Sequence, residues 1–185
     1  MSVVASLLAF SPGSSPAIAG WAGNTGRTGC TAVNMAGYSS LSVYYWNLSS
    51  AMTSAESWVR TNDVDSTDLG TYAINSTSAD IVVRDLDYTD YCGMDWYVSS
   101  AGGGTTGLTT CDTLLANGRC DTHSIRFSTN YTGSATTSQR RNLACHESGH
   151  AIGLTHATSS SSCMTPGGTS QSYNSTEIGW INAAY

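Results

Sequence analysis

Apolar positions along the chain follow two periods: the alternation of a half-buried strand and the period of about 3.6 residues of an amphipathic helix. Residues 41–46 (LSVYYW) are β-branched and aromatic and predict a strand. In residues 50–60, Met52, Ala55 and Val59 recur at helical spacing after a serine suited to cap a helix. We therefore expect a strand followed by an amphipathic helix whose apolar face packs on a sheet.

Further strands are predicted in the middle of the chain. Their candidates are residues 71–75, 80–86 and 123–127, with a short one at 96–99. Glycine and threonine dominate residues 101–110, which we expect to form a loop.

The last third of the chain predicts two helices. Residues 136–154 begin with a Thr/Ser cap and stop at Gly153. Residues 177–184 follow Asn174, which lies three positions before Glu177 in a capping arrangement. Loops are expected at 159–162 and 167–172, and mostly irregular chain at 11–37. Strands and helices in this order indicate an α+β plan in one domain.

The N-terminus allows two interpretations. Residues 3–10 form a short apolar run, and Ala17, Ile18 and Ala19 are similar to a signal-peptide cleavage region. However, no Lys or Arg precedes the run. Residues 1–19 are therefore either a signal-like or a flexible segment, and residues 20–185 are the folded domain. Elsewhere no stretch approaches the roughly 18 apolar residues that a membrane span needs.

Composition and charge exclude several classes of function. Charged residues make up only 11% of the chain, and small neutral polar residues replace them, as suits an extracellular protein. The net charge is -6, and the seven basic residues form no cluster. Nucleic acid and anionic membrane surfaces both require such a basic footprint, so neither is an expected partner.

Six cysteines stand at positions 30, 92, 111, 120, 145 and 163. An even number in a chain of this composition predicts disulfides and an oxidising compartment, whereas free buried thiols would indicate the cytosol. Cys111 and Cys120 are close enough to close their own small loop. Many other pairings remain open at this point.

The segment from His146 to His156 (HESGHAIGLTH) carries the chemistry. Residues four apart share a helix face, so His146 and His150 can place two imidazole nitrogens on one metal ion. Gly153 can adopt a left-handed conformation that ends the helix, and the chain can then return His156 to the same ion. Three protein ligands and one open position are the arrangement of a catalytic zinc.

Glu147 follows the first of these histidines and can reach water beside the metal without ligating it. There it can act as a general base, taking a proton from the water and passing it to the leaving amine. A chance HExxH in an ordinary helix is the alternative. The third histidine and the glycine, both at the required spacing, argue against it.

This segment resembles that of the metzincins, a family of zinc endopeptidases, and within them the matrixin-like branch, which commonly reads HExGHxxGLxH. Residues 162–166 (SCMTP) are similar to the Met-containing turn that metzincins place beneath the zinc, with Met164 eight residues after His156. The resemblance covers residues 142–166 and implies that 20–185 is a metzincin-like catalytic domain. Its implied fold is α+β, with a twisted mixed sheet, a zinc-binding active-site helix, the Met-turn and a C-terminal helix.

In that architecture an antiparallel edge strand lines the cleft, with residues 123–127 or a nearby segment as the candidate. The segments around Cys145 and Cys163 would meet beneath the metal, which implies a Cys145–Cys163 disulfide. Cys111–Cys120 and Cys30–Cys92 would be the other two pairs. Met164 is expected to pack rather than to bind the metal.

Some residues depart from the family or allow two interpretations. Cys30 stands in GCTA, which does not match a matrixin cysteine switch, and Pro166 replaces a tyrosine of other branches. Tyr173 is either an oxyanion partner or, by the stronger interpretation, a packing residue. The sequence predicts no second zinc site, because His123 is the one other histidine, and we expect it to face solvent or the core. Residues Asp85, Asp87 and Asp90 form a Ca²⁺ site or a solvated acidic turn.

The sequence thus predicts a secreted, monomeric zinc endopeptidase that acts on a protein or peptide substrate. The alternative from another class is a non-catalytic zinc-containing surface or virion protein with a binding or structural role. Glu147 argues against it, because a structural site has no need of a base. A third interpretation, a zinc amidase acting on cell-wall peptides, differs only in substrate.

Overall fold

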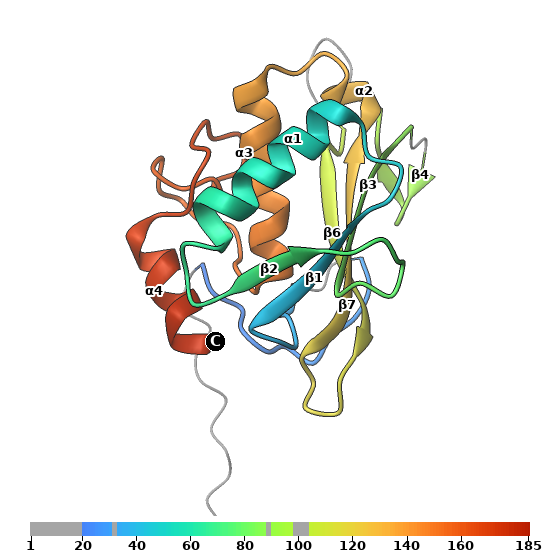
Figure 1. Cartoon of the computed structure of the whole chain (residues 1–185). Helices are drawn as coiled ribbons and strands as arrows, with labels where there is room; N and C mark the ends of the chain where they lie inside the picture. The colour runs from blue at the N-terminus through green and yellow to red at the C-terminus, as the bar shows by residue number, and fades with distance from the viewer. Residues whose placement is uncertain (1–19, 31–32, 88–89, 98–103) are drawn as a thin grey trace, which may run out of the picture.

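The computed structural model describes residues 20–30, 33–87, 90–97 and 104–185 (Figure 1). The predicted N-terminal segment, residues 1–19, lies outside the described residues, as does the first part of the segment expected to be irregular. Residues 20–30 and 33–37 contain neither helix nor strand, as expected, although isolated bridges tie them to the rest of the chain.

One five-stranded sheet forms the centre of the molecule, with the strand order β2-β1-β3-β7-β6. Its strands are β1 (Ser40–Tyr45), β2 (Gly70–Ala73), β3 (Ile81–Leu86), β6 (Gly107–Leu114) and β7 (Cys120–Ser128). Neighbouring strands are parallel except β6, which is antiparallel to β7 and lies at one edge. The four main strand predictions and the mixed sheet with an antiparallel edge strand are confirmed.

Two predictions about this sheet are corrected. Residues 107–110 form a strand and not a loop, because pairing with β7 overrides the weak strand propensity of glycine and buries Thr109 and Thr110. The antiparallel edge is therefore β6, whereas residues 123–127 belong to the interior strand β7.

The short strand predicted at 96–99 is also wrong for Trp96 and Tyr97, and residues 98–99 lie outside the described part of the chain. A two-stranded sheet of β4 (Asp90–Tyr91) and β5 (Met94–Asp95) stands just before them. The aromatic side chain of Trp96 is fully buried, and its indole nitrogen donates to the Tyr91 oxygen.

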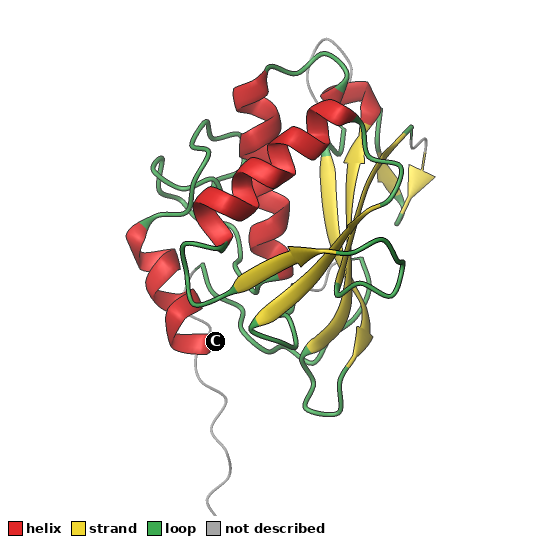
Figure 2. Cartoon of the chain, viewed as in Figure 1, coloured by secondary structure: helices red, strands yellow, loops and turns green. Residues whose placement is uncertain are grey.

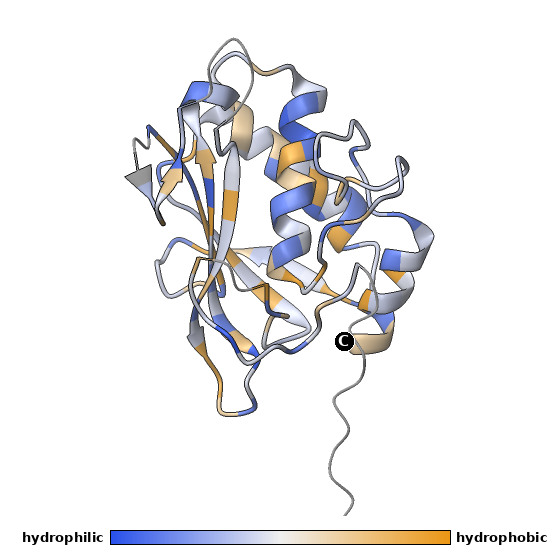
Figure 3. Ribbon diagram, turned by 180° about the vertical axis from the view of Figure 1, so that it is seen from behind, coloured by the Kyte–Doolittle hydropathy of each residue, from blue (hydrophilic) through white to orange (hydrophobic). Residues whose placement is uncertain are grey.

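Helices cover one face of the sheet, as the red and yellow layers of Figure 2 show. They include α1 (Ser50–Val59), continued by the π-helix η1 (Arg60–Val64), and α3 (Thr137–Ala151). Short α2 (Thr129–Thr132) precedes α3, and α4 (Ser175–Ala184) ends the chain. Figure 3 shows hydrophobic and hydrophilic residues on both the strands and the helices. The hydrophobic core lies between helices and sheet and includes Leu41, Val83, Met52, Val59 and Ala144.

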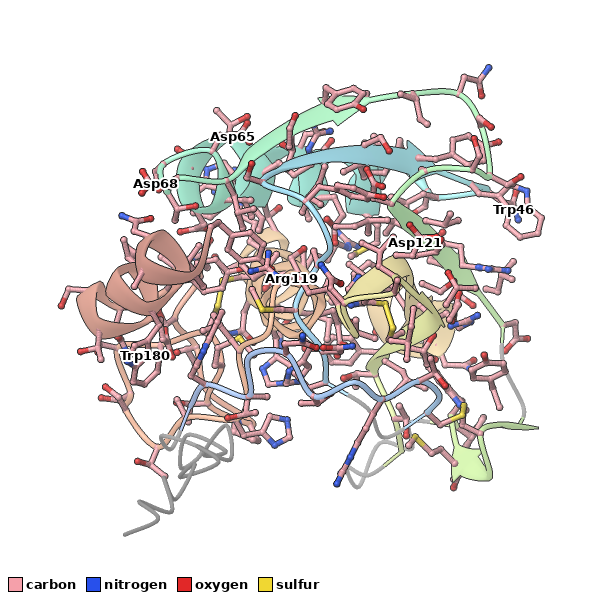
Figure 4. All side chains as sticks on the ribbon, turned by 90° about the horizontal axis from the view of Figure 1, so that it is seen from below. Trp46, Asp65, Asp68, Arg119, Asp121 and Trp180 are labelled. Carbon is pink, nitrogen blue, oxygen red and sulfur yellow. A yellow bond between two sulfur atoms is a disulfide. The ribbon has the colours of Figure 1, made fainter. Side chains whose placement is uncertain are left out.

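The predicted helix caps are present. Ser49 caps α1 by accepting from the Met52 amide. A capping box of Thr136 and Gln139 begins α3, and one of Asn174 and Glu177 begins α4. At its other end α4 is held by Arg119, whose guanidinium donates to the Ala184 oxygen and lies over the Tyr185 ring (Figure 4). The two capping boxes explain why the sequence predicted both helices of the last third of the chain correctly.

Three disulfides crosslink the domain: Cys30–Cys92, Cys111–Cys120 and Cys145–Cys163 (yellow bonds in Figure 4). The second joins β6 to β7, and the third joins α3 to the loop that carries Met164. Disulfides of this number suit an extracellular protein. Of the helices in the described part of the chain, none has the length and apolar character needed to cross a bilayer.

Candidate metal centre

Three histidines converge at the end of α3. His146 and His150 lie one helical turn apart, and their Nε2 atoms are 3.2 Å apart. The ring of His156 approaches both, with centroid distances of 5.0 Å and 5.1 Å. Nitrogens bound to one tetrahedral zinc at its usual bond length are about 3.3 Å apart. The structure therefore brings together the predicted ligands, two of them already at the spacing that one ion requires.

Backbone carbonyls orient two of these rings. Nδ1 of His146 donates to the Cys163 oxygen at 2.9 Å, and Nδ1 of His150 donates to the Leu154 oxygen at 2.8 Å. A carbonyl can only accept, so Nδ1 carries the hydrogen and the lone pair of Nε2 is left for a metal.

Burial favours the neutral, metal-binding form of these imidazoles. It lowers the pKa of His146 and lowers that of His150 to about 3, and the neighbouring histidine charges act in the same direction. A pair of histidines that is neutral in neutral solution is ready to bind a cation without first losing protons.

The predicted turn at Gly153 brings His156 to this site. Gly153 has φ 98°, and the amides of Leu154 and Gly153 donate to the oxygens of Gly149 and His150. This is a Schellman ending, which needs glycine at that position. The Gly20 oxygen then accepts from the Thr155 amide at 3.0 Å, so the N-terminal part of the described chain helps to hold the returning segment.

Glu147 lies beside the histidines and is only 4% exposed. Its Oε2 lies 2.8 Å from the Thr109 hydroxyl of β6. Burial raises the pKa of this carboxyl to about 7, against the weaker lowering effect of the Thr109 hydrogen bonds. A carboxyl with a pKa near neutrality is suited to both accepting and releasing a proton.

The histidines and Glu147 line a cleft of about 830 Å³. Residues 107–109 of β6 form one wall, and Asn142, Leu143 and the loop at 165–169 form another. The described lining residues include no Asp, Lys or Arg, and Glu147 is the one carboxyl among them. A cleft of this size can accommodate a ligand of several residues.

Met164 lies directly behind the histidine helix and is fully buried. A Cβ built on Gly149 would collide with the Met164 sulfur, so the helix and the loop are in close contact at this point. The Met164 amide donates to the Ser162 hydroxyl, which donates in turn to Glu177 of α4. This position is consistent with the packing role expected for Met164.

The remaining candidate residues lie elsewhere. Tyr173 is buried behind α3, where its hydroxyl donates to the Cys145 oxygen, as the packing interpretation expects. His123 lies in the core, and its neighbours Cys111 and Cys120 are disulfide-bonded and offer no thiolate.

The carboxylate of Asp85 accepts from the amide and hydroxyl of Ser49, and Asp87 accepts from Asn130. Asp85 thus supports the start of α1. The side chain of Asp90 lies outside the described residues, and a Ca²⁺ site in this turn stays a prediction.

Three residues of this region were missed by the sequence analysis. Thr109 and Gly107 contact Glu147 from a segment that was expected to be a loop. Glu56 of α1 is buried at 1% exposure, and its Oε2 lies 3.4 Å from the Ser148 hydroxyl. Its place among the apolar positions of the predicted amphipathic helix was the available signal, since a carboxyl on a buried face is unusual.

Comparison with protein-family models and with curated protein sequences gave no match. Two solved structures of myroilysin do match. The crystal structure of myroilysin aligns with a TM-score of 0.53 and 12% identity over 82% of this chain and 86% of that chain. A second myroilysin structure gives a TM-score of 0.54 and 12% identity over 82% of each chain. This chain therefore has a metzincin-like α+β fold, the fold that it shares with myroilysin.

Proposed function

We propose that this protein is a secreted zinc endopeptidase, with zinc held by His146, His150 and His156 and with Glu147 as the general base. The observation that carries the proposal is the 3.2 Å spacing of the His146 and His150 Nε2 atoms beside the Glu147 carboxyl in one cleft. The fold likeness to myroilysin supports a metallopeptidase. The three disulfides support a location outside the cell.

The chemistry of the donor set favours zinc. Three imidazole nitrogens suit zinc, whereas calcium and magnesium prefer oxygen ligands. In His146 and His150 the other ring nitrogen, Nδ1, donates to a backbone oxygen, as is usual for zinc-binding histidines. A zinc ion bound here would supply Lewis-acid activation of a water molecule and of the scissile carbonyl.

The protein's own contribution centres on Glu147. Its carboxylate accepts the proton of the attacking water at one oxygen, and then donates that proton to the amine of the departing peptide. Burial in the cleft wall raises the pKa of Glu147 to about 7, so the carboxyl can carry the proton between the two steps. The neutral cleft lining leaves this group as the proton acceptor nearest to the three histidines.

An extended peptide fits the wall of the cleft. Residues 107–109 belong to β6, an edge strand of the sheet, and they line the cleft. Backbone groups of an edge strand can pair with an added strand, which is a common mode of peptide recognition. This supports a polypeptide substrate bound in extended conformation.

Cleavage of a quenched fluorescent casein tests the proposal. We expect the wild-type protein to cleave casein, a zinc chelator to abolish cleavage and added zinc to restore it. Glu147→Ala should remain inactive with or without zinc. Wild-type protein that binds zinc but cleaves neither casein nor a mixed peptide library would contradict the proposal and favour a binding role for the same fold.

A further inference from the structure

Two residues of the edge strand contact the carboxyl of Glu147. Gly107 and Thr109 are two positions apart on β6, so they present the same face of the strand to α3. Thr109 meets one carboxyl oxygen of Glu147, and Gly107 lies against the other. The two oxygens are thus approached from two adjacent positions of one rigid element.

Thr109 binds Glu147 twice. Its Oγ1 lies 2.8 Å from Oε2 of Glu147 and also 2.8 Å from the backbone oxygen of Glu147. Both residues are buried, so bulk water is poorly placed to replace the hydrogen bonds between them. A hydroxyl has one hydrogen and can also accept. It can therefore donate to an ionised Glu147 carboxylate. Alternatively, it can accept from the protonated carboxyl and donate to the backbone oxygen.

Gly107 contributes space. A Cβ built at this position would lie 2.7 Å from Oε1 of Glu147 and 2.9 Å from its Cγ. The backbone of Gly107 is outside the left-handed region, so its conformation alone would allow other residues. A side chain at this position would therefore displace the carboxyl of Glu147, which fills the volume that the side chain would take.

We infer that Thr109 and Gly107 are positioning residues for Glu147: the Thr109 hydroxyl fixes its carboxyl, and the absence of a side chain at Gly107 leaves room for it. This inference rests on the proposed function for its catalytic meaning. The positioning itself is a property of the protein that can be measured without any reaction. The Thr109 hydrogen bond and the open space at Gly107 together hold the carboxyl of Glu147 in one place.

The first test is nuclear magnetic resonance of metal-free protein labelled at glutamate carboxyl carbons. The chain has three glutamates, Glu56, Glu147 and Glu177, so the spectrum is simple, and Glu147→Gln assigns the Glu147 signal. Thr109→Val and Gly107→Ala should each shift the Glu147 signal and leave those of Glu56 and Glu177 in place. Thr109→Ser keeps the hydroxyl and should leave the Glu147 signal close to its wild-type position.

The second test measures zinc binding and casein cleavage in the same variants. Thr109→Val and Gly107→Ala should lower kcat about 10–100-fold, the usual loss when a residue supporting an active-site group is removed. The KM and the zinc affinity should stay near wild type, and Thr109→Ser should recover most of kcat. Gly70→Ala is the matched control: Gly70 begins the edge strand β2, and an added Cβ there would meet nothing within 4 Å.

The two tests separate this inference from the proposed function. A shifted Glu147 signal in a protein that cleaves nothing would support the positioning and overturn the peptidase. A folded Thr109→Val or Gly107→Ala protein with an unchanged Glu147 signal and full kcat would overturn the inference. If Thr109→Val does not fold, Gly107→Ala and Thr109→Ser decide by the same criteria.

Discussion

The backbone oxygen of Cys163 accepts the Nδ1 hydrogen of His146 at 2.9 Å, and the same two segments are joined by the Cys145–Cys163 disulfide. The disulfide joins Cys145, the residue just before His146, to Cys163, whose backbone oxygen orients the His146 ring. The loop before Met164 is therefore tied to the candidate metal centre by one covalent bond and one hydrogen bond.

Removing this disulfide should weaken zinc binding as well as stability. We expect the Cys145→Ala/Cys163→Ala double variant to lose about 2–4 kcal/mol in its free energy of unfolding. Its zinc affinity should fall about 10–100-fold, because the carbonyl that holds His146 is no longer fixed. Denaturant unfolding and competition with a chromophoric chelator measure the two effects.

The disulfide between Cys111 and Cys120 provides the control, since it joins β6 to β7 and not the segments that carry the proposed metal ligands. Its double alanine variant should lose stability and keep its zinc affinity. Equal losses of zinc affinity in both double variants would mean that the Cys145–Cys163 bond has no particular role in orienting His146.

A methyl group at Gly149 should be destabilising. Gly149→Ala would collide with the Met164 sulfur and also place a Cβ 3.1 Å from the Tyr173 ring. Overpacking of this kind costs about 1–3 kcal/mol. Gly179→Ala in α4 is the control, because an added Cβ there meets nothing within 4 Å, and the change should stabilise by up to about 1 kcal/mol. Thermal unfolding compares the two, and similar effects would contradict the close contact of helix and loop.

Glu56 should make stability depend on pH. Burial raises its pKa from 4.5 to about 8, so the folded state holds a proton that the unfolded state releases. The stabilisation is complete below about pH 4.5 and is lost as the pH rises through 8. Each displaced pKa unit corresponds to about 1.4 kcal/mol. Glu56→Gln should therefore unfold with a weaker pH dependence between these limits, and denaturant titrations at several pH values measure the difference. Parallel curves for the two proteins would show that Glu56 is ionised in the folded state.

Zinc should stabilise the folded protein. An ion that binds only the folded state at a free concentration of 100 times its Kd adds about 2.7 kcal/mol to the free energy of unfolding. A chelator should therefore lower the melting temperature of the wild-type protein. His156→Ala should bind zinc more weakly and gain less from it, although His146 and His150 remain. A variant that gains as much as wild type would exclude His156 as a ligand.

Local signals made much of the fold predictable from the sequence. Thr136 with Gln139 and Asn174 with Glu177 begin two helices within four residues of chain, and Gly153 ends one of them. Short runs of β-branched, aromatic and apolar residues predicted four of the five strands in the main sheet. In each case the residues that determine the element lie inside it or within two positions of its ends.

What was missed depends on contacts between distant segments. Residues 107–110 begin with a glycine and follow a glycine-rich stretch, and their pairing with β7 is the contact that places them in the sheet. Thr109 meets Glu147 across 38 positions of sequence, and Glu56 meets Ser148 across 92. No local pattern encodes such distances. The HExxHxxGxxH segment was readable because all its proposed ligands lie within one helix and one turn.

The rate of casein cleavage by Glu147→Gln, compared with wild type at equal zinc content, tests the central claim most directly. The substitution keeps the size of the side chain and removes its capacity to take a proton. We expect equal zinc binding and a kcat lowered about 10²–10⁴-fold, the usual contribution of a general base. A Glu147→Gln protein that binds zinc and cleaves at the wild-type rate would contradict the account.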